Sequence, residues 1–128
     1  LTVKVSGEAK EAGITFYMDE DQHYDLALVN ECGSRYVILR LKVGDAESVK
    51  RSELLPAGCE QVELQIHSDA DKYYFSYLID DKEEKLGNAR TKYLSSEVAG
   101  GFTGVLMAMY AVDKEGKWAE FSELMWQQ

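Results

Sequence analysis

The sequence has little positive charge. Of its 128 residues, 14 are Lys or Arg and 23 are Asp or Glu, so the formal net charge is −9. Because phosphate binding depends on clustered Lys and Arg, this balance argues against nucleic acid as a partner. The longest apolar run, residues 105–112, is far shorter than the ~18 residues of a membrane-spanning helix. We therefore expect neither nucleic acid nor a membrane as a partner.

Cysteine and histidine are also scarce. Cys32 and Cys59 are too few for a disulfide framework, so we expect two buried thiols, with one bridge as the alternative. The sequence has no CxxC motif and no Cys/His cluster, and a zinc site is not expected. His23 and His67 stand in polar surroundings at strand ends, where they do not suggest a nucleophilic triad.

The apolar residues that are present follow a period of two. A chain of this length fits one domain, residues 1–128. Alternation of apolar and polar residues is typical of strands with one buried face. It occurs in residues 3–5, 14–18, 24–28, 37–43 and 62–66. Turn-forming stretches separate these segments, which predicts an all-β antiparallel sandwich or barrel.

Four segments depart from this pattern. Residues 105–112 are apolar on both faces, which predicts a central strand covered on both sides. Residues 117–126 suggest a last strand that closes a sheet. Residues 50–55 are weakly helical in character, and residues 89–101 are expected to form a long loop.

The acidic residues do not form an evident catalytic pair. A glycosidase needs two carboxyls ~5–9.5 Å apart across a sugar site. No predicted strand alternates acids in this way, and Asp19, Glu20 and Asp21 are expected in a solvated turn. We therefore predict no catalytic residue, no cofactor and no metal. A structural calcium ion bound by residues 18–25 or 67–72 is the alternative.

Aromatic residues are frequent, and some are candidates for stacking on sugar rings. The sequence contains eight Tyr, four Phe and two Trp. We take Tyr17, Tyr24 and Tyr74 as candidates for a shallow sugar-binding face. The alternative for each is packing in the core or across strands.

Three blocks in order resemble a known domain. They are AGITFYMDEDQHYDLALV (residues 12–29), QVELQIHSDADKYYFSYLID (61–80) and EVAGGFTGVLMAMYAVDKEGKWAEFSELMW (97–126). Together they resemble the C-terminal β-sandwich of glycoside hydrolase family 43 β-xylosidases and α-L-arabinofuranosidases. The resemblance spans nearly the whole chain and implies a jelly-roll sandwich of the concanavalin A-like type.

The resemblance also implies where the chemistry lies. In such enzymes the catalytic acids belong to an N-terminal five-bladed β-propeller, and the sandwich packs against it. An aromatic residue in a glycine-flanked loop helps to close the sugar pocket. Here that residue would be Phe102, with Gly101 and Thr103 beside it. The alternative is that Phe102 only caps the core.

Two departures from the family pattern are visible. Ser122 stands where the last strand usually carries a second acid beside Glu120, which weakens any polar role there. Family domains also usually begin some strands before Leu1, so we expect a fragment that lacks its first strands. The exposed edge would be covered by the missing segment or by a second copy in a homo-oligomer.

Three functions are open on this evidence. The first is a non-catalytic accessory domain of a xylan- or arabinan-degrading bacterial enzyme, with the propeller and an oligosaccharide substrate as partners. The second is an autonomous carbohydrate-binding module, and the third is a sandwich enzyme in its own right. Periplasmic, secreted and cytoplasmic locations all remain open.

Overall fold

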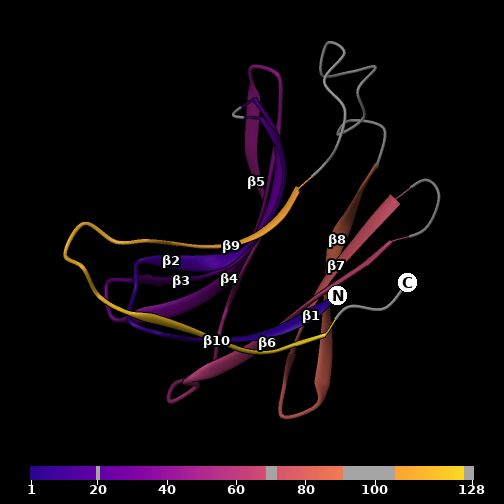
Figure 1. The fold of residues 1–128 in the computed structure, drawn as a ribbon. Coiled ribbons are helices and arrows are strands. Elements are labelled where there is room, and N and C mark those ends of the chain that lie inside the picture. The colour runs from indigo at the N-terminus through magenta and orange to yellow at the C-terminus, as the bar shows by residue number, and fades with distance from the viewer. Residues whose placement is uncertain (20, 69–71, 91–105, 126–128) are drawn as a thin grey trace.

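The computed structural model describes residues 1–19, 21–68, 72–90 and 106–125 (Figure 1). Within these residues the chain forms ten strands. They are β1 (Thr2–Gly7), β2 (Glu11–Asp19), β3 (Gln22–Glu31), β4 (Ser34–Val43), β5 (Ala46–Leu54), β6 (Gln61–Ser68), β7 (Lys72–Ile79), β8 (Lys82–Arg90), β9 (Leu106–Val112) and β10 (Ala119–Met125). None of the described residues belongs to a helix long and apolar enough to cross a membrane.

The strands form two five-stranded sheets that pack face to face. The first sheet has the order β10-β1-β6-β7-β8 and the second has the order β5-β4-β3-β2-β9. All neighbouring strands within each sheet run antiparallel. Figure 1 shows the second sheet bending sharply along its strands, so that its outer face is concave. This arrangement confirms the predicted all-β sandwich and excludes the barrel.

The core lies between the sheets and follows the period-two pattern. Val3 and Val5 on β1 are fully buried, as are Leu26 on β3 and Leu39 on β4. Burying each such side chain contributes about 1.5–3 kcal/mol before the entropy of ordering is counted. One continuous apolar cluster holds the two sheets together.

The strand β9 corrects one prediction. It is an edge strand that pairs only with β2 among the described residues, rather than a central strand. Met109 and Val112 are 44% and 54% exposed. The apolar character of both faces therefore does not reflect burial within the described part of the chain.

The prediction for residues 50–55 was also wrong. Most of this segment belongs to β5, which pairs with β4 along its length. Leu55, which follows the strand, is buried in the core. The hydrogen bonds offered by β4 outweigh a weak local helix preference, because propensities are small beside tertiary contacts.

The cysteines are not two buried thiols. Cys32 is exposed in the turn between β3 and β4, and Cys59 is half-buried after β5. Both thiols are free, so the alternative prediction, a disulfide bond between Cys32 and Cys59, is wrong as well.

Gly13 marks a close approach between β2 and β3. A Cβ atom placed on Gly13 would lie 2.1 Å from the Leu26 carbonyl oxygen and 2.5 Å from the Ala27 Cα. Both contacts are with backbone, which cannot move without disturbing the β2–β3 pairing. Glycine is therefore required at this point of the second sheet.

We predict that Gly13→Ala lowers the free energy of unfolding by about 3 kcal/mol, because the added methyl overpacks a rigid backbone contact. Thr15→Val is the matched control two residues along the same strand. The Thr15 hydroxyl is buried without a hydrogen-bond partner among the described residues, so its removal should stabilise by about 1 kcal/mol. Urea unfolding followed by fluorescence measures both. A Gly13→Ala variant as stable as the parent would contradict the close approach.

Candidate functional site

The glycine-flanked loop that carries Phe102, Gly101 and Thr103 lies outside the described residues, so the structure does not test its assigned role. The strands on either side of it are described. The strand β8, which precedes the loop, is an edge strand of the first sheet, and β9, which follows it, is an edge strand of the second. Both ends lie at the same end of the sandwich in Figure 1. The segment that contains Phe102 therefore connects the two sheets.

The expectation that Tyr24 stacks on sugar is corrected by its burial. Tyr24 is 0% exposed and lies in the core. Its ring contacts Tyr73 and Phe75 edge-on, with centroid separations of 6.0 and 6.3 Å. A ring enclosed in this way presents no face to a ligand in solvent.

Tyr17 and Tyr74 lie on opposite outer faces of the sandwich. Tyr17, on β2, is half-buried on the concave face of the second sheet and stacks against His23, with ring centroids 6.0 Å apart. Tyr74, on β7, is 39% exposed on the outer face of the first sheet. The predicted sugar-stacking set is thus not one platform but three separate environments.

A network of charged residues lies on the outer, concave face of the second sheet. Arg40 on β4 makes a two-pronged contact with Glu11 on β2, at 2.7 and 2.9 Å, across the intervening strand β3. The Tyr110 hydroxyl on β9 donates a hydrogen bond to the same carboxylate. Contacts from one carboxylate therefore join β2 to β4 and to the edge strand β9.

Asp25 completes the network from β3. It lies directly opposite Arg40 in the β3–β4 register, and Arg40 Nη1 is 3.2 Å from Asp25 Oδ2. The other carboxylate oxygen of Asp25 is 2.9 Å from His23 Nδ1. The side chain of Asp25 is only 7% exposed, although it faces away from the core. Neighbouring side chains on the curved face cover it.

The electrostatics of this network do not suit acid catalysis. Burial alone would raise the pKa of Glu11, but hydrogen bonds from Arg40 and Tyr110 outweigh it and hold this pKa below its usual value. The Glu11 hydrogen bonds also raise the pKa of Arg40, which stays charged. Burial, together with the nearby Glu11 carboxylate, raises the pKa of Tyr110. A glycosidase general acid needs a raised carboxyl pKa, so Glu11 is a structural anion.

Sequence reasoning missed this network. Asp25 and Arg40 each interrupt an apolar run, HYDLALV and YVILRLKV, and this was the available signal. A charge inside such a run is costly unless it is paired. The pairing itself was not visible, because Glu11 and Arg40 are 29 residues apart.

The candidate calcium segments are only partly described. Residues 20 and 69–71 lie outside the described part of the chain, so these stretches stay untested. Among the described residues, no group of three or more His, Cys, Asp or Glu side chains is placed to hold a metal ion.

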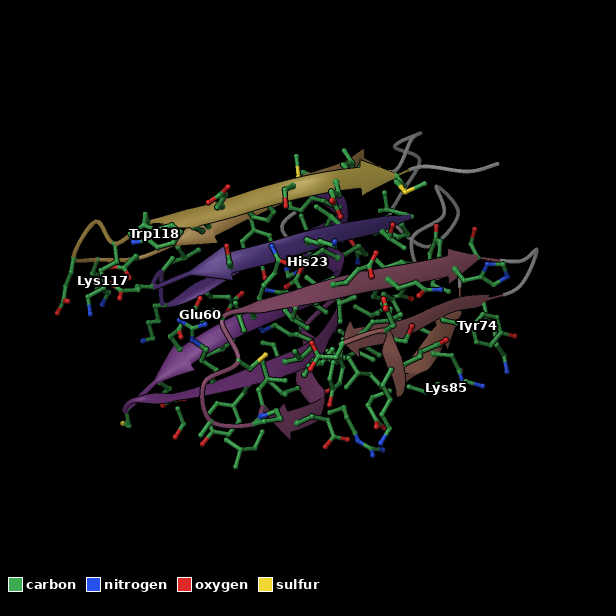
Figure 2. All side chains as sticks on the ribbon, turned by 90° about the horizontal axis from the view of Figure 1, so that it is seen from below. His23, Glu60, Tyr74, Lys85, Lys117 and Trp118 are labelled. Carbon is green, nitrogen blue, oxygen red and sulfur yellow. The ribbon has the colours of Figure 1, made fainter. Side chains whose placement is uncertain are left out.

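A shallow hollow of about 640 Å³ lies on the outer face of the first sheet. It is lined by Gln65, His67, Tyr74, Phe75, Ser76, Glu83, Lys85, Gly87 and Asn88. These residues belong to β6, β7 and β8. Figure 2 shows Tyr74 and Lys85 close together on this face. An exposed aromatic ring beside several polar groups is the kind of lining found in small-ligand sites.

The fold defines the class of the protein: a two-sheet antiparallel sandwich of the concanavalin A-like type. The chain matches the family described as "Beta xylosidase C-terminal Concanavalin A-like domain" over residues 1–127. It belongs to this family, the C-terminal domains of glycoside hydrolase family 43 proteins.

Individual relatives agree with this assignment. The chain is 36% identical over 104 residues to the non-reducing end α-L-arabinofuranosidase BoGH43B of Bacteroides ovatus, covering 81% of this chain and 20% of that protein. The solved Bacteroides ovatus xyloglucan-locus GH43B matches with a TM-score of 0.75 at 28% identity, over 96% of this chain and 27% of that one. The Bacillus licheniformis BlXynB structure has a TM-score of 0.79 at 19% identity, over 92% and 25% of the two chains, and supports the fold alone. The chain thus spans about a fifth to a quarter of the length of these relatives.

We predict that Glu11→Gln lowers the free energy of unfolding by about 2 kcal/mol at pH 7, because Arg40 loses the closer of its two carboxylate partners. The folded-state pKa of Glu11 lies below its usual value of 4.5, so ionised Glu11 contributes stability above that pH. This contribution disappears as pH falls through the folded pKa. The difference between parent and variant should therefore begin to shrink as pH falls below 4.5 and should vanish once pH is below the folded-state pKa of Glu11.

Urea unfolding at several pH values measures this. Glu53→Gln is the matched control, because it removes an ion pair with Arg51 in which the two side chains are 33% and 55% exposed. Such a pair is worth less than about 1 kcal/mol. A pH-independent loss in Glu11→Gln would show that its charge is not what stabilises the second sheet.

Proposed function

We propose that the chain is the non-catalytic accessory β-sandwich of a family 43 enzyme that degrades xylan or arabinan. It packs on a catalytic propeller and helps to close the sugar pocket through Phe102. The family match over residues 1–127 carries this proposal. The low coverage of the arabinofuranosidase relative supports it, since 20% of that protein corresponds to this chain.

The chemistry of the described residues supports a role without catalysis. Glu11 and Asp25, the acids of the charged network on the concave face, both bind Arg40. A catalytic pair needs one acid that holds a proton and one that is free to attack or to activate water. Carboxylates committed to a guanidinium perform neither task.

The edge formed by β9 and β10 is the surface that we propose packs against the preceding part of the longer polypeptide. Met109 on β9 lies opposite the buried Ile14 and so belongs to the core side of its sheet, yet it is 44% exposed. On β10, Leu124 is 46% exposed, while Phe121 lies opposite the buried Val5 and is half-buried. Core-side apolar residues on two exposed edge strands favour further packing.

We predict that Met109→Glu with Leu124→Glu is nearly neutral in the isolated chain, because both side chains are already exposed there. In the longer enzyme the same pair should lower the melting temperature by several degrees, since it buries charges in an interface. Val49→Glu is the matched control: Val49 is 53% exposed on β5, the opposite edge strand of the same sheet. Equal effects of the double variant and of the control in the longer enzyme would reject this edge as the packing surface. Differential scanning calorimetry measures the parent and the double variant in both forms, and the control in the longer enzyme.

We predict that the isolated chain does not hydrolyse nitrophenyl xyloside or nitrophenyl arabinofuranoside. In the longer enzyme, Phe102→Ala should lower kcat/KM about tenfold, because a pocket loses one aromatic contact worth about 1–1.5 kcal/mol. The melting temperature should stay unchanged. Turnover by the repurified chain would refute the accessory role. A lowered melting temperature with unchanged kcat/KM would instead identify Phe102 as a core cap.

A further inference from the structure

The hollow on the first sheet has a small residue, Ser76, at its centre. Ser76 on β7 lies directly opposite Gln65 on β6 and Lys85 on β8. Its own side chain is short, and the residue is only 6% exposed. The register also shifts between Phe75 and Ser76, where β8 passes through Gly87. The longer side chains around Ser76 therefore extend further outward than Ser76 does, and the surface is hollowed at Ser76.

A row of three residues, two of them with aromatic rings, borders the hollow beside Ser76. His67, Tyr74 and Asn88 lie opposite one another on β6, β7 and β8. The rings of His67 and Tyr74 are 6.3 Å apart and inclined by 35°. Directly opposite residues are ~4.5–5.5 Å apart at Cβ, so the row spans three strands as one edge of the hollow. Tyr74 lies near the start of β7, and Figure 2 shows it well away from Glu60 and Trp118.

The charges of the lining restrict the kind of ligand. Glu83 and Lys85 contribute one charge of each sign, so the carboxylate and ammonium charges of the lining balance. The whole chain carries −9, which repels nucleic acids and acidic polysaccharides. Gln65, Ser76 and Asn88 bear groups that both donate and accept hydrogen bonds, as do sugar hydroxyls. A neutral, hydroxyl-rich ligand with one apolar face matches this lining.

We infer that this hollow binds a neutral glycan chain, with one sugar ring stacked on Tyr74 and its neighbour over Ser76. Residues Tyr74 and Ser76 are two apart on one strand, a spacing of roughly 6.6 Å that suits adjacent units of an oligosaccharide. The inference rests on the proposed function only for the choice of glycan. It adds a second sugar contact to the accessory domain, built from residues other than the Phe102 loop.

The hollow is shallow, so glycan binding is expected to be weak, with a Kd on the order of 1 mM for a hexasaccharide. Calorimetry and NMR titration of the 128-residue chain with xylohexaose and with arabinohexaose test it. We expect shifts of the backbone amides of His67, Tyr74, Lys85 and Asn88 with at least one of the two. A polygalacturonate oligosaccharide should bind at least tenfold more weakly than the better neutral ligand.

Substitutions locate the site. Tyr74→Ala should weaken binding tenfold or more, whereas Tyr74→Phe, which keeps the ring, should stay within about threefold of the parent. Tyr17→Ala is the matched control, because Tyr17 is a partly exposed tyrosine on the outer face of the other sheet. Thermal unfolding verifies that each variant is folded.

Three results would overturn the inference. The first is no binding of either neutral hexasaccharide at 10 mM, roughly ten times the expected Kd. The second is an equal loss of affinity in Tyr74→Ala and Tyr17→Ala, and the third is an equal loss of affinity in Tyr74→Phe and Tyr74→Ala. None of them bears on the accessory role, which is tested by hydrolysis and by Phe102→Ala. Conversely, turnover by the isolated chain would refute the accessory role and leave the binding data as they are.

Discussion

The contact between Arg40 and Glu11 is the interaction on which the second sheet depends most. It crosses β3 to join β4 to β2, and through Tyr110 it extends to β9. Each charge in it lies largely out of water, with Glu11 16% and Arg40 22% exposed. Buried charges of this kind are tolerated only when every partner is in place. The network therefore favours one register for four strands, in addition to the register set by the core.

The same network determines what the concave face can do. A curved sheet face that carries neighbouring acids has the general layout of a sugar-hydrolysing site. Here Glu11 and Asp25 both bind Arg40, and the hydrogen bonds to Glu11 hold its pKa below the usual value. The chain belongs to the family 43 C-terminal domains and corresponds to 20% of the length of the arabinofuranosidase relative. The first sheet, in contrast, keeps an open hollow beside an exposed tyrosine.

Much of the fold was predictable from period-two alternation. Residues 3–5, 24–28, 37–43 and 62–66 all lie in strands, and their alternating apolar residues pack in the core. The errors have a common origin. Residues 50–55 and 105–112 were assigned from local character, but the neighbouring strand determines whether a segment is extended, and its place in the sheet determines whether both faces are covered. The three tyrosines show the same limit for the site, since similar sequence contexts placed Tyr24 in the core and Tyr74 on the surface.

The sequence by itself determined the two-faced strands, the acidic surface and, through three ordered blocks, the family. These properties depend on neighbouring residues or on composition, which the linear order contains. Only the tertiary structure decided that Arg40 meets Glu11, that β9 is an edge strand, and that Gln65, Ser76 and Lys85 lie side by side in the hollow. Each of these results from residues far apart in the chain whose relative positions depend on strand register and sheet order, and neither is a local property of the sequence.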